Sequence, residues 1–169
     1  VSTLDASNYD NDVLNIFSKI LPRFIIMSTQ KNKIKDNIEI CILNDDVDKL
    51  TAESLQKKIK KNYPDGIQNY PIHLLNSNYK VLDTCKNSQL IFLFNSNEKD
   101  INRALLFAQE NTILSMSYDE KLLESGVAIS LFIGRKVLPY INMEAIKNNK
   151  IELNGMLLRV SKIYYGKEK

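Results

Sequence analysis

The stretch ICILNDD, residues 40–46, decides the fold class of this chain. It belongs to an apolar run over residues 38–43 with little polar interruption, and two acids, Asp45 and Asp46, follow the run. A strand that is apolar on both sides is typical of a parallel sheet covered by helices on both faces. A second such run, LIFLF at residues 90–94, is the most apolar of the predicted strands, so we expect it at the centre of the sheet.

Helical patterns separate the predicted strands. Apolar residues spaced by three and four predict a helix that begins at Asn11 and another over about residues 48–62. Asn97 and Asp100 resemble a capping box and predict the start of a third helix. Pro22 interrupts the first pattern and predicts a kink or an end nearby. Alternation of strand and helix favours a mostly parallel sheet.

The second half of the chain adds shorter elements. Ser117 with Glu120 predicts a capping box for a short helix, and Asn154 opens a last helix that carries Tyr164 on its apolar face. The predicted strands cover residues 38–43, 72–75, 90–94, 112–116, 127–133 and 136–141, the last two as an antiparallel pair. We therefore predict a three-layer α/β fold. Its mostly parallel, twisted sheet has about five to six strands flanked by helices and ends in an antiparallel C-terminal hairpin.

Length and composition limit the class of protein. The 169 residues fit one domain, which we expect over residues 9–166 after a loose, polar segment at residues 1–8. A net charge of +3, no Trp and no stacked aromatic platform argue against nucleic-acid binding. No apolar run approaches about 18 residues, so the sequence predicts no membrane-spanning helix.

The acids after the first strand do not indicate catalysis. In receiver domains a similar acid pair holds Mg²⁺ and a later aspartate accepts a phosphoryl group, but here the third strand ends at Asn95, which cannot form an acyl phosphate. The sequence contains no GxGxxG, P-loop or GxSxG motif, and His73 is its only histidine. We therefore expect no enzyme activity, no cofactor and no metal site. Asp45 and Asp46 fit the positive end of the following helix.

A binding module remains an alternative. Strand ends at one edge of a parallel sheet can form a ligand pocket, and Asn44, Asp45, Asn95 and Ser117 would line it. This alternative predicts a small-ligand sensor or a degenerate receiver-like protein.

Several segments, taken in order, resemble the YfiR-like family of small bacterial periplasmic proteins. They are ICILNDD at 40–46, QLIFLFNS at 89–96 after Cys85, TILSMSYD at 112–119, SGVAISL at 125–131, VLPYINMEAI at 137–146 and NGMLLRV at 154–160. The resemblance implies a non-enzymatic regulator located in the periplasm, with its signal peptide removed. Proteins of this family restrain an inner-membrane diguanylate cyclase by binding its periplasmic domain, and an outer-membrane lipoprotein can sequester them. The expected output is control of cyclic di-GMP and biofilm, although another membrane signalling protein could be the partner.

The resemblance bears on the state of the two cysteines. An oxidising periplasm allows a disulfide between Cys41 and Cys85, and two buried thiols are the alternative. The bridge requires the segment at residues 79–85 to fold back over the face of the sheet. Some family members carry a second cysteine pair that this chain lacks, so redox sensing through that pair does not transfer. Ser125-Gly126 stands where the family often has paired glycines.

A regulator of this kind needs an exposed surface for its partner. The hairpin and the last helix are the candidates, because Arg and Tyr are favoured interface residues. The predicted partner-binding residues are Arg135, Tyr140, Ile141, Arg159 and Tyr164. An edge hairpin could also pair with its own copy to form a homodimer.

Overall fold

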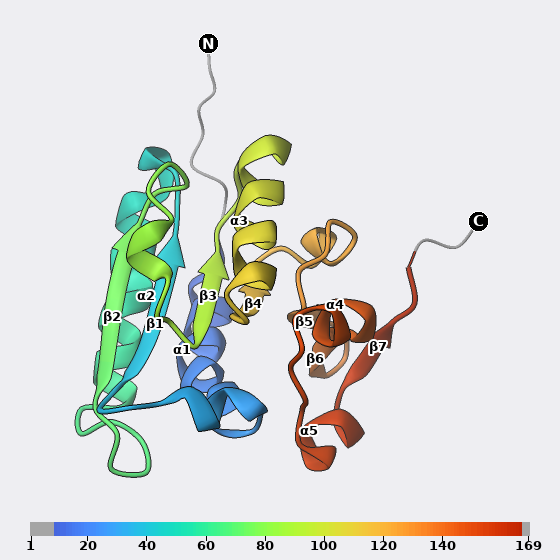
Figure 1. The fold of residues 1–169 in the computed structure, drawn as a ribbon, viewed down its shortest axis with the longest axis horizontal. Coiled ribbons are helices and arrows are strands. Elements are labelled where there is room, and N and C mark those ends of the chain that lie inside the picture. The colour runs from blue at the N-terminus through green and yellow to red at the C-terminus, as the bar shows by residue number, and fades with distance from the viewer. Residues whose placement is uncertain (1–8, 167–169) are drawn as a thin grey trace.

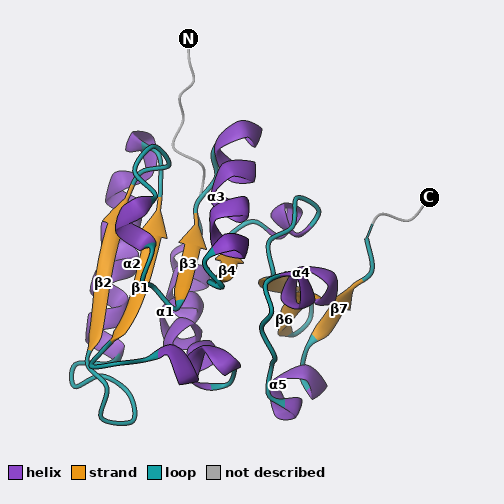
Figure 2. Cartoon of the chain, in the orientation of Figure 1, coloured by secondary structure: helices purple, strands orange, loops and turns teal. Residues whose placement is uncertain are grey.

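The computed structural model describes residues 9–166, so the segment expected to be loose, residues 1–8, lies outside the described part. Strands and helices alternate along the first two thirds of the chain, and shorter elements follow (Figures 1 and 2). The helices are α1 Asn11–Ile26, η1 Thr29–Lys33, η2 Asp46–Asp48, α2 Lys49–Asn62, η3 Asp83–Cys85, α3 Glu98–Glu110, η4 Glu120–Leu123, α4 Met143–Asn148 and α5 Gly155–Arg159. The strands are β1 Ile38–Leu43, β2 Ile72–Ser77, β3 Leu90–Leu93, β4 Leu114–Ser117, β5 Ile129–Ile133, β6 Val137–Asn142 and β7 Lys162–Tyr164.

Within residues 9–166 the strands form one sheet in the order β2-β1-β3-β4-β5-β6-β7. Strands β1 to β5 are parallel, β5 and β6 form the antiparallel hairpin, and β7 runs parallel to β6. The first five strands have the 2-1-3-4-5 order of flavodoxin-like, doubly wound proteins. The predicted fold class is confirmed, and β7 is the strand that the sequence did not indicate.

Burial on both faces explains why the central strands are so apolar. Helices α1 and α2 cover one face of the sheet, and α3 and η3 lie on the other (Figure 1). Side chains of β1 and β3 alternate between the two cores, with Ile40, Ile42, Leu90 and Phe92 toward α1 and α2, and Cys41, Leu43, Ile91 and Leu93 toward α3. All eight are at most 1% exposed, as a strand with two covered faces requires.

Helix α1 has a different N-cap from the predicted one. Asp10, not Asn11, is the N-cap, because its Oδ1 accepts hydrogen bonds from the backbone N–H groups of Asp12 at 2.7 Å and Val13 at 3.3 Å. Pro22 lies inside the helix, which ends four residues later at Ile26. The apolar contacts of its last turn with the core hold the helix together beyond the proline.

Two elements of the second half also differ from expectation. Ser117 is the last residue of β4, and Asp119 instead caps η4 by accepting a hydrogen bond from the Lys121 N–H at 2.9 Å. The last helix, α5, ends at Arg159, so Tyr164 lies on β7 and not on a helix.

Buried serines join β4 to β5, where the strand pairing is short. Met116 and Ile129 are the pair in register between these strands. The Ser115 hydroxyl accepts from the Ala128 N–H at 2.9 Å, and the Ser130 hydroxyl donates to the Ser117 carbonyl at 2.8 Å. These side chains therefore satisfy backbone groups that would otherwise be buried without partners.

Candidate functional site

The carboxyl ends of β1 and β3 form the first candidate site. Chain connections leave these neighbouring strands in opposite directions, to β2 and to β4, and ligands of doubly wound proteins bind at this switch point. Asn44 and Asp45 follow β1, and Asn95 follows β3, so three of the four predicted pocket residues meet at this edge. Ser117 ends β4, the next strand along the edge.

Two of these side chains face a buried environment. Asn44 is 5% exposed and donates through Nδ2 to the Asp45 carbonyl at 2.9 Å, while its Oδ1 has no hydrogen-bond partner. The Oδ1 atom of Asn95 is also buried without a partner. Ser117 is buried, and its hydroxyl donates to the Asp119 carbonyl at 2.8 Å, so it serves the turn after β4. Two acceptor atoms thus remain unsatisfied near the switch point.

Tyr9 fills this edge of the sheet, which the sequence did not predict. Its hydroxyl donates to Asp48 Oδ2 and accepts from the Asn95 N–H, each at 3.1 Å. Its ring lies edge-on against Phe94, with centroids 4.9 Å apart, and against Tyr118, with centroids 4.6 Å apart. No local pattern around Tyr9 signals these contacts, because its partners are 39 to 86 residues away for the hydrogen bonds.

The acids near the switch point belong to the start of α2. Asp45 precedes η2, Asp46 begins it, and Asp48 stands directly before the first residue of α2. Carboxylates at this position are favourable beside the positive end of the helix dipole. Within residues 9–166, no three His, Cys, Asp or Glu side chains are arranged to hold a metal ion.

Cys41 and Cys85 form a disulfide on the α3 face of the sheet, with Cα atoms 5.5 Å apart. The segment that ends in η3 folds back over this face, which is the arrangement that the bridge requires. Tyr79, 1% exposed, lies in the same core as the bridge, and its hydroxyl donates to the Phe94 carbonyl. Burial, reinforced by Asp45, raises the pKa of Tyr79 far above its usual value.

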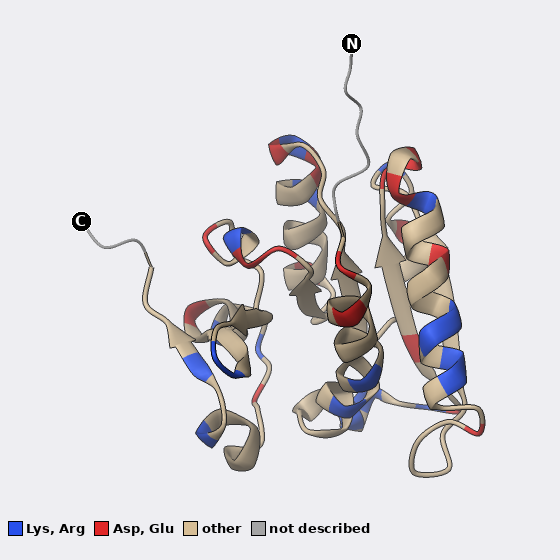
Figure 3. Ribbon diagram, turned by 180° about the vertical axis from the view of Figure 1, so that it is seen from behind, with Lys and Arg blue, Asp and Glu red and all other residues tan. Residues whose placement is uncertain are grey.

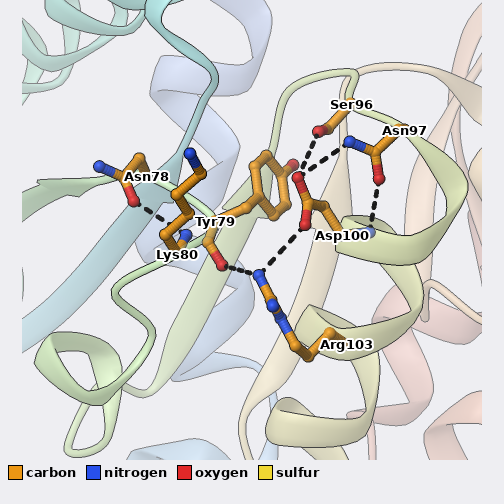
Figure 4. Close-up of polar contacts among 7 residues, drawn as sticks. All are labelled: Asn78, Tyr79, Lys80, Ser96, Asn97, Asp100 and Arg103. Atoms are coloured by element: carbon orange, nitrogen blue, oxygen red, sulfur yellow. Dashed lines mark hydrogen bonds and ion pairs between the residues drawn. The ribbon is translucent and has the colours of Figure 1, made fainter.

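The same segment is tied to the N-terminus of α3 (Figure 4). Arg103 Nη2 donates to the Tyr79 carbonyl at 2.6 Å and to Asp100 Oδ1 at 3.1 Å. Asn97 accepts from the Asp100 N–H at 2.8 Å and donates to Asp100 Oδ2 at 3.0 Å, so the predicted cap of α3 is reciprocal. Together with the disulfide, these contacts fix the segment before β3 against the sheet.

A second candidate site lies on the C-terminal strands. Phe132 of β5, Tyr140 of β6 and Lys162 and Tyr164 of β7 point to the same side of the sheet and form what we call the aromatic face. Tyr140 lies 5.7 Å from Phe132 and 5.8 Å from Tyr164 between ring centroids, and the Lys162 ammonium stands 3.7 Å above the Phe132 ring. The three rings are partly exposed, and Lys162 is exposed. Burial, with Glu120 as a smaller cause, raises the pKa of Tyr140.

The structure brings only some of the predicted partner-binding residues together. Tyr140 and Tyr164 are neighbours on the aromatic face. Ile141 is fully buried because it points to the opposite side of β6, so it contributes no contact surface. Arg135 is exposed at the hairpin turn, and Arg159 is exposed at the end of α5. The hairpin is not at the edge of the sheet, since β7 pairs with β6, so a homodimer formed by strand pairing would have to use β2 or β7.

Several basic residues lie near the aromatic face. Residues 125–143 and 153–166 contain Arg135, Lys136, Arg159 and Lys162 and no Asp or Glu. Figure 3 shows the basic positions on β7 and α5. Acids also approach the aromatic face, since Glu120 contributes to the raised pKa of Tyr140, and Glu124 and Glu144 line a hollow together with Tyr164. An exposed lysine among aromatic side chains, as Lys162 is here, suits an acidic group of a protein partner.

Together, the strand order, the helices on both faces and the hairpin extension define a doubly wound α/β protein with an open aromatic face near its C-terminus. A family model described as YfiR/HmsC-like matches residues 18–162, and the chain belongs to this family. This is a family of regulatory proteins associated with periplasmic control of diguanylate cyclase signalling. Among the helices of residues 9–166, none has the length and apolar character needed to cross a bilayer.

Solved structures of similar fold include the following two. A conserved domain protein from Vibrio cholerae O1 biovar El Tor matches with a TM-score of 0.60 and 11% identity, over 90% of this chain and 59% of that one. The ABC domain in complex with L-Trp from Streptococcus pneumonia matches with a TM-score of 0.60 and 10% identity, over 87% and 60% of the two chains. The chain thus spans about 60% of each matched protein, and this identity shows the fold alone. Curated proteins gave no significant match.

Proposed function

We propose that this protein is a non-enzymatic periplasmic regulator that binds and restrains an inner-membrane diguanylate cyclase, or a similar membrane sensor protein. The observation that carries the proposal is the family match, which covers residues 18–162. By this proposal the protein controls cyclic di-GMP production, and with it biofilm formation, through contact and without turnover. An outer-membrane lipoprotein that sequesters it would release the cyclase.

The aromatic face is the surface that we assign to the membrane partner. Tyr140 and Tyr164 can each contribute large contact area at little cost in side-chain entropy, and interface energy concentrates in such residues. Lys162, whose ammonium lies over the Phe132 and Tyr140 rings, favours a partner segment that carries Asp or Glu. Rim charges mainly affect the rate of association and its dependence on salt, whereas the tyrosines would determine how long the complex lasts.

Binding to the periplasmic domain of the membrane diguanylate cyclase encoded nearest to this gene tests the proposal. Isothermal titration calorimetry with the purified proteins should give a complex for the unmodified chain. Lys162→Glu combined with Tyr164→Ser should weaken it by at least about tenfold, as expected for the loss of an interface anchor. Lys60→Glu, an exposed lysine on α2, is the matched control and should bind normally. Absence of a complex with that domain removes the proposed partner, and equal binding by both variants removes the proposed surface.

A further inference from the structure

Tyr9 lies at the switch point of the sheet, and the proposed function gives it no role. In doubly wound proteins this crevice receives the ligand, but here a side chain of the same chain occupies it. Both hydrogen-bonding functions of the phenol are used, since the hydroxyl donates to Asp48 Oδ2 and accepts from the Asn95 N–H, each at 3.1 Å. Ligand pockets are mostly apolar and orient the ligand through a few polar groups. The Tyr9 hydroxyl is held in the same way, by one carboxylate acceptor and one backbone donor.

The ring of Tyr9, like its hydroxyl, is held by defined contacts. Its plane is turned by 76° from that of Phe94 and by 90° from that of Tyr118, with centroids 4.9 and 4.6 Å away. Edge-to-face pairs at these distances are the favoured arrangement of aromatic rings. Asp48, Phe94, Asn95 and Tyr118 therefore form a seat that selects a flat ring with a hydroxyl at one end.

Tyr9 can leave this seat without disturbing a helix or a strand. It precedes both α1 and the Asp10 cap of that helix. The next residue is held by one hydrogen bond to the same seat, from the Asp10 N–H to the Tyr118 hydroxyl at 2.7 Å. The residues of the seat lie outside the segment that carries Tyr9: Phe94 and Asn95 follow β3, Tyr118 follows β4, and Asp48 ends η2.

Two further observations indicate a ligand in place of Tyr9. The Oδ1 atoms of Asn44, which is 5% exposed, and of Asn95 are buried at this edge without partners, so acceptors are available for additional donors. A hollow of about 420 Å³ adjoins Tyr9 and is lined by Asn95, Tyr118 and residues of η4 and β5. A ligand larger than a phenol can therefore extend from the seat into this space.

We propose that the switch-point crevice is a binding site for a phenolic ring and that Tyr9 occupies it as an intramolecular ligand. An external ligand with a tyrosine-like phenol and the chain's own Tyr9 then exclude each other. The ligand can be a free phenolic compound or a tyrosyl group of a peptide, because both present the same ring and hydroxyl. This site is separate from the aromatic face and does not depend on the proposed function.

Cavity complementation tests the site. In Tyr9→Ala the seat is empty, and p-cresol should bind there with a dissociation constant on the order of 1 mM. The shift of the Asn95 amide in ¹H–¹⁵N spectra should report it. The unmodified protein and Tyr9→Phe, whose ring still fills the seat, should bind p-cresol at least about tenfold more weakly, the factor expected for a competing intramolecular group. Toluene, which lacks the hydroxyl, should bind Tyr9→Ala more weakly than p-cresol.

Each outcome of this titration decides the proposal. N-acetyltyrosinamide binding Tyr9→Ala more tightly than p-cresol would assign the site to tyrosyl peptides, and the reverse order would assign it to free phenols. No shift of the Asn95 amide in folded Tyr9→Ala, or equal binding to the unmodified protein, overturns the proposal. The experiment contains no partner protein, so its failure leaves the proposed regulatory function untouched.

Hydrogen exchange of the unmodified protein decides the matter if Tyr9→Ala does not fold. The Asn95 N–H is covered by the Tyr9 hydroxyl, whereas the Phe94 N–H donates to the Leu43 carbonyl at 3.0 Å inside the sheet. An exchangeable Tyr9 predicts that the Asn95 amide exchanges by a local opening, faster than that of Phe94 and independently of low denaturant concentrations. Exchange of both amides only through global unfolding would show that Tyr9 is a permanent part of the core.

Discussion

Reduction of the Cys41–Cys85 disulfide should lower the free energy of unfolding by about 4 kcal/mol. The bridge joins residues 44 positions apart in the sequence, and both cysteines are fully buried in the core on the α3 face. It also fastens the segment that carries Tyr79 against β1, beside the Arg103 contacts. Its loss therefore frees a long loop in the unfolded chain while the native packing around it largely remains.

The magnitude follows from the length of the closed loop. For a separation of 44 residues, the chain-entropy relation gives about 4 kcal/mol at 25 °C. A protein of this size is stable by about 5–15 kcal/mol, so the bridge contributes a large part of the total. With a urea dependence of about 2 kcal/mol per molar, the midpoint of unfolding should fall by roughly 2 M.

Urea unfolding followed by circular dichroism, with and without dithiothreitol, measures this shift. Thiol titration in denaturant supplies the control and should find no free thiol in the untreated protein and both thiols after reduction. The Cys41→Ala, Cys85→Ala double variant should have a urea midpoint close to that of the reduced protein, and dithiothreitol should not change it. A fully reduced protein that unfolds within about 0.3 M urea of the oxidised one, far below the shift of roughly 2 M, would refute the reasoning.

Three further predictions concern buried polar groups. Ser115→Ala removes the acceptor of the buried Ala128 N–H, so the free energy of unfolding in urea should fall by about 1–3 kcal/mol. Ser125→Ala, at an exposed position, is the control, and a similar loss in that variant would contradict the explanation. Arg103→Met leaves the Tyr79 carbonyl without its donor and should speed hydrogen exchange around η3 while β5 is unaffected. Burial raises the pKa of Tyr79, so its hydroxyl keeps its proton in the folded protein at a pH at which the unfolded chain loses it, above about pH 10. The free energy of unfolding should therefore fall as the pH rises above about 10, and it should fall less steeply in Tyr79→Phe.

The sequence predicts best those elements whose signal is local. Helix α2 appears almost as expected, because its apolar spacing, its lysine-rich outer side and the following Pro64 agree with one another. Strands β1 and β3 are equally clear, since uninterrupted apolar runs between polar turns fit strands buried on both faces. Where pattern, length and boundary residues point to the same element, tertiary contacts have little to override.

The C-terminal elements show where local reasoning fails. Leu157, Val160 and Tyr164 have helical spacing, but the helix ends at Arg159, and residues 162–164 pair with β6 instead. Ile141 and Tyr140 are adjacent in a strand and therefore face opposite sides, so one is core and the other surface. Which side of a hairpin is covered depends on distant segments, and the sequence of the hairpin does not contain that information.

The same limit explains why the switch point was only half predicted. Asn44, Asp45 and Asn95 could be placed at one edge because parallel strands end together, but the occupant of that edge comes from Tyr9, in a segment without periodicity. Tyr9 fills the centre of this edge, yet buried polar atoms beside it have no partner. A side chain with a purely structural role would be expected to leave no buried polar group unsatisfied. The aromatic face begins on β5, the strand next to β4, and shares none of these residues. If Tyr9→Ala left binding at the aromatic face unchanged, the two surfaces would act independently; a changed affinity would mean that the seat and the partner site are coupled.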